Sequence, residues 1–382
     1  MAATDIQDTK GKSRLDWVDT DKGLSIILVV ARHTASGVAL SLGKMPLVFG
    51  LISTLAAPYR MPLFFVVAGL FAASYMQRPL REFIDKKLLH FAYFYFLWSA
   101  IQIGMKMSLP GGLHEVGIKD LLLSPIEPFG VLWFIYALPL FFVMMRLMRN
   151  VPKLLVVAVA LIFYFARIDT GWTVPDEAAL RFIFFVGGVY CAPYVFQIAD
   201  WAHENALNAV LLGLVTLVSI GVVTLTPLID MRAVELLAGI AGCIGCVMLV
   251  SVATSKGLTG WLTYIGSRSL YVFVAFFLPM ALTRVVMVKA GVTNGDLITL
   301  VAVSLGVALP LVAARFLEGT HFAFFFTRPQ FLRLDLKKKA PAAQAVLPVV
   351  KPVEAPEAVF DGVSLPFLAE ARRRRGAAAA LS

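Results

Sequence analysis

The chain has 382 residues, of which 59% are hydrophobic and only 15% are charged. Soluble proteins are about 45–50% apolar and about 25% charged, so this composition excludes a soluble globular fold and predicts a multi-pass protein in a lipid bilayer. The net charge of +10 does not indicate nucleic-acid binding, because lysine and arginine cluster in short loops and in the tail, as basic cytoplasmic loops do.

Ten hydrophobic segments follow one another, at 23–42, 47–76, 88–108, 129–148, 153–169, 179–198, 206–227, 233–253, 268–288 and 296–317. Their lengths approach 20 residues and they show no two-residue alternation, so they predict an all-α polytopic transmembrane helical bundle of about ten spans. The second segment is too long for one straight span, and Pro58 and Pro62 interrupt it, which predicts a broken helix. The semi-polar stretch 257–268 is expected to be an interfacial or re-entrant piece.

Positive charge divides the connections between these segments into two sets. The N-terminal segment and the second, fourth and eighth loops are rich in lysine and arginine, whereas the alternating loops are poorer. This bias predicts a cell (inner) membrane protein with both termini in the cytoplasm. The polar start lacks the apolar core of a signal peptide, so no cleavage is expected.

Three domains are expected. A cytoplasmic N-terminal segment covers 1–22, a transmembrane domain covers 23–327, and a disordered, basic, Ala- and Pro-rich cytoplasmic tail covers 328–382. In the tail, Lys337–Lys339 and Arg372–Arg375 either attract anionic lipid or only enforce the topology. The longest external loop, about 108–128 with His114 and Glu115, forms either a vestibule for a polar acceptor or an ordinary solvated connection.

The cysteines do not indicate a metal site. Cys191, Cys243 and Cys246 all lie inside apolar stretches, and the Cys243–Cys246 pair has no second pair and no nearby histidine. They are interpreted as small packing residues, and no metal is expected.

His33 is the first candidate for chemistry. It lies eleven residues after Lys22, which on a helix is a rise of about 16 Å, or half of a hydrocarbon core about 30 Å thick. With Lys22 at one membrane surface the imidazole lies near the midplane, where an ionisable side chain indicates a functional site and a histidine is suited to act as a general base. The alternative is a short, tilted helix in which His33 only hydrogen-bonds a neighbouring helix.

Arg60 is the second candidate. It lies between Pro58 and Pro62, where a broken helix leaves backbone groups unpaired and a guanidinium can line a wet cavity. The alternative is that its side chain extends to the outer interface. Arg32 is also polar within an apolar span, whereas four ionisable residues near predicted span ends are expected to reach the interface by default: His90, Glu235, Arg284 and Glu318.

The second cytoplasmic loop concentrates positive charge. Arg78, Arg81, Lys86 and Lys87 lie within ten positions. Such a cluster suits the phosphates of a nucleotide-containing donor at the inner membrane surface. The alternative is a basic loop that only sets the topology.

Five stretches, in order, resemble the acyltransferase-3 family of integral membrane O-acyltransferases. Asp19–His33 resembles its first helix, in which a basic residue followed by Gly precedes a His by eleven positions. Arg60–Gly69 resembles its second-helix Met-Pro-Leu-Phe-Phe signature, and Arg78–Arg81 its cytoplasmic Arg-x-x-Arg. Leu132–Leu138 resembles its mid-chain Trp-Phe segment, and Ile265–Tyr271 its late Gly-x-x-Ser-Leu segment.

Two departures from the family pattern stand out. Members commonly carry a His shortly after the late Ser-Leu segment, and here that region reads VFVAFFLP at 272–279. No C-terminal hydrolase-like domain of the kind that some members append follows the last segment, so acceptor delivery is expected to involve the membrane domain or a separate protein.

The resemblance implies transfer of a short acyl group from acyl-CoA to a hydroxyl of a surface carbohydrate or glycolipid. In this scheme His33 is the base or transient acyl carrier, Arg60 stabilises the oxyanion, and Asp19 assists at the helix entrance. Trp133 and Tyr136 contact the substrate. The donor phosphates lie near the basic residues Lys22, Arg78, Arg81, Lys86 and Lys87.

Two rival interpretations remain. A transporter or flippase for a polar envelope metabolite also uses buried His and Arg with a broken helix. A non-catalytic assembly or sensor protein could retain the same bundle without the late His.

Overall fold

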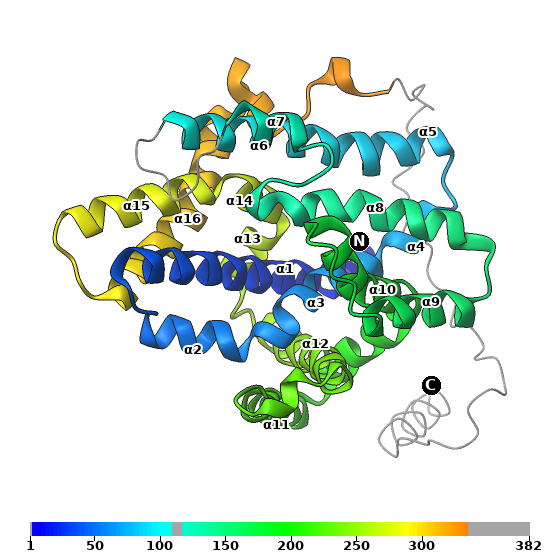
Figure 1. The fold of residues 1–382 in the computed structure, drawn as a ribbon. Coiled ribbons are helices and arrows are strands. Elements are labelled where there is room, and N and C mark those ends of the chain that lie inside the picture. Colours follow the sequence, from blue (N-terminus) through cyan, green and yellow to red (C-terminus); the bar gives the residue numbers. More distant parts are fainter. Residues whose placement is uncertain (1, 109–116, 335–382) are drawn as a thin grey trace, which may run out of the picture. The chain divides into compact units, whose positions relative to one another are not determined.

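The computed structural model describes residues 2–108 and 117–334, with side chains from Asp16 onward, and in these residues every regular element is a helix (Figure 1). The predicted all-α polytopic bundle is therefore confirmed. Four predicted features lie outside the described residues: His114, Glu115, Lys337–Lys339 and Arg372–Arg375.

Seven helical stretches of the described chain are long and apolar enough to cross a membrane. They contain α1 (Ala2–Leu42), α6 (His90–Ser108), α8 (Trp133–Leu147), α10 (Thr173–Glu204), α11 (Ala206–Thr224), α12 (Arg232–Ser255) and α16 (Gly295–Leu317). Two bent pairs raise the number of candidate spans to nine: α2 (Leu47–Leu55) with α3 (Ala57–Leu70), and α14 (Ser269–Ala275) with α15 (Phe277–Lys289).

The remaining predicted segment is short. It forms α9 (Lys153–Phe165), whose 13 residues rise only about 20 Å, less than the thickness of a hydrocarbon core. Shorter helices connect the spans: α4 (Ala72–Met76), α5 (Leu80–Phe83), α7 (Ile118–Leu123) and α13 (Gly260–Ser267). A π-helical turn, Ile84–Leu89, joins α5 to α6.

The second span is broken, as the prolines predict. Helices α2 and α3 meet at Ala56 with a bend of 56°. Pro58 falls in the first turn of α3, where its missing N–H is tolerated because that turn has no intrahelical partner. The bend frees the carbonyl of Ser53, and the Arg60 guanidinium donates to it at 3.3 Å.

The ninth span is also bent, which the sequence analysis did not predict. Helices α14 and α15 meet at Phe276 with a bend of 52°. Pro279 lies in the first turn of α15 and has no N–H to continue the ladder from α14. In both bent spans, therefore, the first helix ends three or four residues before a proline.

Helix α1 is the centre of the arrangement. In Figure 1 it runs through the middle of the described helices, with α11 and α12 on one side and α6 on the other. It contacts α3, α12, α13, α15 and α16, and Ile26, Val30, Ala35 and Val38 on it are fully buried. A residue on α1 is thus positioned by most of the other helices.

Glycines allow the closest of these contacts. Gly266 of α13 lies directly against the backbone of α1, so that a Cβ at this position would overlap the carbonyl oxygen of Asp19. A Cβ at Gly23 would in the same way overlap the carbonyl oxygen of Leu262. Small residues permit such backbone approach between membrane helices, and α13, within the predicted stretch 257–268, consequently packs closely against α1 between Asp19 and Gly23.

The segment after α16 folds back onto α6. The Tyr93 hydroxyl donates to the Phe324 carbonyl at 2.8 Å, and the Trp98 indole N–H donates to the Phe325 carbonyl at 3.0 Å. The buried Arg328 guanidinium pairs with the buried Asp85 carboxylate at 2.5 Å. The described chain therefore stays packed up to Leu334, beyond the start of the predicted tail.

Candidate active site

His33 lies in α1, with its side chain half-buried among other helices. Its ring centroid is 5.9 Å from that of Phe276, at the bend between α14 and α15. Phe276 belongs to the 272–279 stretch in which no histidine follows the late Ser-Leu segment. In this chain an apolar ring from that stretch therefore packs against His33.

Arg60 joins His33 in the interior. Both Arg60 and Arg32 lie close enough to His33 for their charges to act on the imidazole. Arg60 reaches this position because the α2–α3 bend turns the start of α3 toward α1. The structure thus brings together the two residues that the sequence singled out, from spans that are separate in the chain.

Aromatic rings extend from this point into the core. The ring centroids of Phe276 and Phe273 are 6.3 Å apart, and those of Phe273 and Phe134 are 5.2 Å apart. The ring centroid of Phe134 is in turn 4.9 Å from that of Phe65. Trp133 closes the series at 6.2 Å from Phe65. Trp133 is therefore connected to His33 through a row of packed apolar rings.

Tyr136 has a different neighbourhood. Its hydroxyl donates to the Pro125 carbonyl at 2.8 Å, and its ring lies 5.2 Å from that of Tyr95. The first contact connects α8 to the segment that follows α7, and the second connects α8 to α6. Its predicted role in substrate contact stays a prediction.

Asp19 is not brought to His33. The two are fourteen residues apart on one continuous helix, a separation of about 21 Å. The Asp19 carboxylate instead accepts a hydrogen bond from the Lys22 ammonium at 2.9 Å, and both side chains are about a third exposed. This pair lies at the end of the bundle where α13 meets α1.

The acidic residue in the interior is Asp21, which sequence reasoning passed over. It is fully buried, and within the described residues neither carboxylate oxygen has a hydrogen-bond partner. The Trp17 indole N–H and the Ser25 hydroxyl, four residues away on either side, are also buried without a partner. The i, i+4, i+8 spacing places all three on one face of α1, and this spacing was readable from the sequence.

Basic residues gather around Lys22 of α1. The Lys87 ammonium lies 3.8 Å from the centre of the Tyr75 ring, and the Arg78 guanidinium lies 4.5 Å from the same ring. Lys22, Arg78 and Lys86 are all within electrostatic range of Lys87. The structure therefore assembles most of the predicted basic residues into one group, called the basic cluster below: Lys22, Arg78, Lys86 and Lys87.

An acidic residue partly balances the basic cluster. Glu82 pairs with Arg78 at 2.5 Å and with Lys86 at 2.8 Å. Arg81, the second arginine of the Arg-x-x-Arg stretch, is exposed to solvent. Within the cluster, Glu82 is thus the acidic partner of both Arg78 and Lys86, while the Lys87 ammonium lies over the Tyr75 and Phe142 rings.

Two arginines from α8 and its end hold this region in place. Arg146 donates to the carbonyls of Tyr75 and Met76, each at 3.3 Å, and its guanidinium lies 4.6 Å from the centre of the Phe83 ring. Arg149 donates to the Met76 carbonyl at 3.4 Å. These bonds satisfy the last carbonyls of α4. From the sequence, both arginines were expected only to set the orientation of the protein in the membrane.

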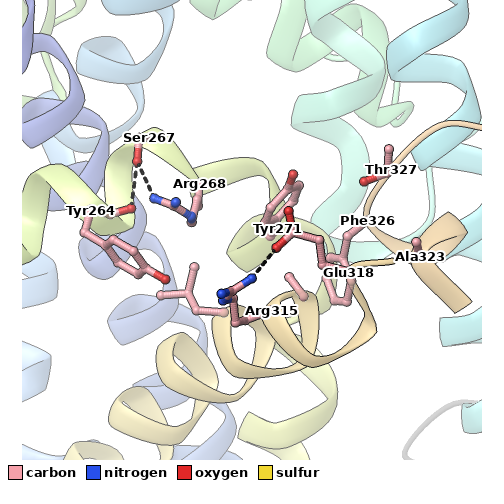
Figure 2. Close-up of a pocket in the computed structure, with 11 residues that line it drawn as sticks. Tyr264, Ser267, Arg268, Tyr271, Arg315, Glu318, Ala323, Phe326 and Thr327 are labelled. Atoms are coloured by element: carbon pink, nitrogen blue, oxygen red, sulfur yellow. Dashed lines mark hydrogen bonds and ion pairs between the residues drawn. The ribbon is translucent and has the colours of Figure 1, made fainter. Parts of the chain in front are cut away.

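A cavity of about 610 Å³ opens near the late segment (Figure 2). Arg268 lies over the Tyr264 ring at 4.1 Å and donates to the Ser267 hydroxyl at 3.1 Å, while Arg315 pairs with Glu318 at 2.8 Å at the end of α16. The remaining lining includes Tyr271, Leu311, Phe326 and Thr327. Its residues come from α13, α14, the end of α16 and the segment that follows α16.

The described residues contain no group of three or more His, Cys, Asp and Glu side chains placed to hold a metal ion. Cys243 and Cys246 are buried in α12, and Cys191 is exposed.

One comparison with known proteins gives a match. A family model described as an acyltransferase domain (Acyl_transf_3) matches residues 15–315, a range that contains His33, Arg60, the basic cluster and the late segment. No curated protein and no solved structure matches the chain.

Proposed function

Because the chain belongs to the acyltransferase-3 family, we propose that this membrane acyltransferase moves a short acyl group, such as acetyl, from acyl-CoA to a hydroxyl of a cell-envelope carbohydrate or glycolipid. Acyl transfer and membrane-spanning helices are properties of the family and the fold. The donor, the acceptor and the catalytic base are the proposal. One observation carries it: the His33 imidazole of α1 and the Arg60 guanidinium of another span lie within electrostatic range of each other inside the bundle, and Lys22 of the basic cluster lies on the same helix as His33.

His33 is proposed as the general base. Its ring nitrogen takes the proton of the acceptor hydroxyl as that oxygen attacks the thioester carbonyl. The C–O bond forms, the carbonyl oxygen gains negative charge, and Arg60 stabilises this oxyanion. The intermediate collapses with cleavage of the C–S bond, and the imidazolium returns the proton to the departing thiolate.

The basic cluster is proposed to bind the phosphates of the donor. Lys22 and His33 are eleven residues apart on one helix, about 16 Å. Phosphates held at the cluster therefore leave the thioester arm to extend along α1 toward His33. In the orientation expected from the loop charges, this end of the bundle faces the cytoplasm, where acyl-CoA is made.

The proposed function is tested with the purified full-length chain in liposomes. Release of free thiol from acetyl-CoA, together with recovery of acylated envelope glycan, is the expected result. Movement of an envelope metabolite across the liposome membrane with no consumption of acetyl-CoA would instead favour the transporter. Comparison of cell-envelope glycans by mass spectrometry, with and without the protein, would identify the acceptor.

Replacing Arg78 with glutamine is expected to raise the KM for acetyl-CoA about tenfold and to leave kcat nearly unchanged. The change removes one charged group that can hydrogen-bond the phosphates of acetyl-CoA. It also leaves the Glu82 carboxylate with one partner fewer, so that its negative charge repels acetyl-CoA more strongly. The measurement is the initial rate of thiol release against acetyl-CoA concentration at fixed salt. Arg167→Gln, an exposed arginine after α9, is the control and should keep the wild-type KM. Equal KM values for Arg78→Gln and the control would contradict donor binding at the basic cluster.

A further inference from the structure

Arg32 and Arg60 lie within electrostatic range of His33, and Arg284 packs against Gly37, one helical turn further along α1. Among the described residues, none of the three arginines has a carboxylate partner. We propose that Arg32, Arg60 and Arg284, called the arginine group below, bind a phosphate or carboxylate carried by the acceptor. The group takes one residue from each of three spans: α1, the bent α2–α3 pair and the bent α14–α15 pair. The identification of the ligand as the acceptor rests on the proposed function, whereas the anion site itself rests only on the geometry.

Arg284 is placed by a glycine on α1. Its guanidinium packs on Gly37, so that a Cβ at this position would overlap the Nη1 atom of Arg284. Gly37 lies four residues after His33 and therefore on the same face of α1, one turn further along. The Nε of Arg284 is buried and has no hydrogen-bond partner among the described residues.

The other two arginines are bonded only to uncharged groups in the described part of the chain. Arg32 donates to the Ser36 hydroxyl, and Arg60 donates to the Ser53 carbonyl. Arg32 and Arg60 also lie within electrostatic range of each other. Like charges held together in a region of low dielectric constant repel, so this arrangement costs free energy unless an anion joins it.

Two other arginines of the bundle, in contrast, each have a carboxylate partner. Arg181, which is within range of Arg60, pairs with Glu177 at 3.1 Å, and Arg232 pairs with Glu235 at 2.8 Å. Each of these carboxylates lies within one helical turn of its arginine. In the part of the chain that the structure describes, no carboxylate pairs with a member of the arginine group, and this supports a ligand as the source of the missing negative charge.

The position of the group favours the acceptor over the donor as the source of that anion. Gly37, on which Arg284 rests, is fifteen residues beyond Lys22 on α1, about 22 Å. The basic cluster proposed for the donor phosphates lies on the opposite side of His33. An arginine pair suits phosphate and carboxylate groups because its planar donors bind both oxygens at once.

Binding of matched sugars tests the site without acyl-CoA. The full-length chain is placed in nanodiscs of phosphatidylcholine, and the affinities for glucose 1-phosphate, glucuronate and glucose are measured by calorimetry. The wild-type protein is expected to bind the two anionic sugars at least about tenfold more tightly than glucose. Arg284→Gln is expected to weaken anion binding about 10- to 100-fold, with no change for glucose. Arg284→Lys keeps the charge and retains part of the preference, and Arg167→Gln binds as the wild type does.

A second arm distinguishes the source of the anion. Nanodiscs containing phosphatidylglycerol, with no sugar added, report binding of a lipid phosphate through a rise in the unfolding midpoint relative to phosphatidylcholine. A rise in the wild type that is absent in Arg284→Gln and in Arg32→Gln, without any sugar preference, supports an anion site that takes a lipid-linked group. Equal affinity for glucose and for both anionic sugars, together with no effect of the anionic lipid, overturns the site. If Arg284→Gln is not monodisperse on size exclusion, Arg32→Gln and Arg284→Lys carry the comparison.

Failure of this proposal and failure of the proposed function give different results. Anion binding that depends on Arg284, without any acyl transfer, removes the acyltransferase mechanism and leaves the anion site. Acyl transfer to a neutral sugar at the same rate in wild type and Arg284→Gln, with no anion preference in binding, leaves the mechanism and removes the site.

Discussion

Replacing His33 with glutamine is expected to lower kcat for acyl transfer about 10²- to 10⁴-fold while the protein still inserts and folds. Glutamine fills a similar space and can hydrogen-bond the acceptor hydroxyl, but its amide does not take up the proton. The side chain is half-buried beside Phe276, so the packing change is small. The measurement is thiol release from acetyl-CoA at saturating donor, with the acylated product recovered by mass spectrometry.

His90→Gln is the matched control. His90 is also a half-buried histidine in a membrane helix, and its ring lies 5.1 Å from that of Phe94. It belongs to α6, and the charged groups that act on it are Arg328, Lys87, Arg333 and Asp85 rather than Arg60. This variant should therefore keep the wild-type kcat. Full activity in His33→Gln, with wild-type amounts of inserted protein, would remove His33 as the base.

Replacing Gly266 with alanine is expected to destabilise the bundle by about 3 kcal/mol or more, since overpacking usually costs about 1–3 kcal/mol and here the clash is with backbone. The new methyl group would overlap the carbonyl oxygen of Asp19, and its other near neighbours are the Asp19 carbonyl carbon and the Gly23 amide. None of these atoms can rotate aside, so α13 must separate from α1. The measurement is the midpoint of thermal unfolding, followed by tryptophan fluorescence in nanodiscs.

The same helix offers the control for this change. Gly260 begins α13, and a Cβ there meets no atom within 4 Å. Gly260→Ala is therefore expected to leave stability unchanged or to raise it by up to about 1 kcal/mol through helix propensity. Equal unfolding midpoints for the two alanine variants would show that the contact between α13 and α1 does not limit stability.

Hydropathy and proline were sufficient to predict most of the helical architecture. Long apolar segments become helices because lipid offers no partner for unpaired backbone groups, and the break before Pro58 follows from its missing N–H. The bend at Phe276 has the same cause, with Pro279 in the next turn. It was missed because residues 268–288 have the length of an ordinary straight span, so nothing in their hydropathy required a break.

The candidate site was only partly predictable. His33 and Arg60 were identifiable because ionisable side chains are rare within apolar segments, and the structure brings them together. Asp19 was chosen over Asp21 from its motif position, although the angular spacing of Trp17, Asp21 and Ser25 marks the buried face. Arg284 was assigned to the membrane interface because it lies near the end of a predicted span. That position does not reveal that Gly37 on α1 leaves room for the Arg284 guanidinium inside the bundle.

The fold-back of the chain after α16 sets a practical limit on truncation. A protein cut at residue 315, where the family match ends, would lose the carbonyls that accept hydrogen bonds from Tyr93 and Trp98. It would also leave Asp85 as a buried carboxylate with no guanidinium beside it, a defect of about 3–5 kcal/mol. A stop codon or a fused reporter therefore belongs after Leu334, whose amide donates to Asp85 at 2.9 Å.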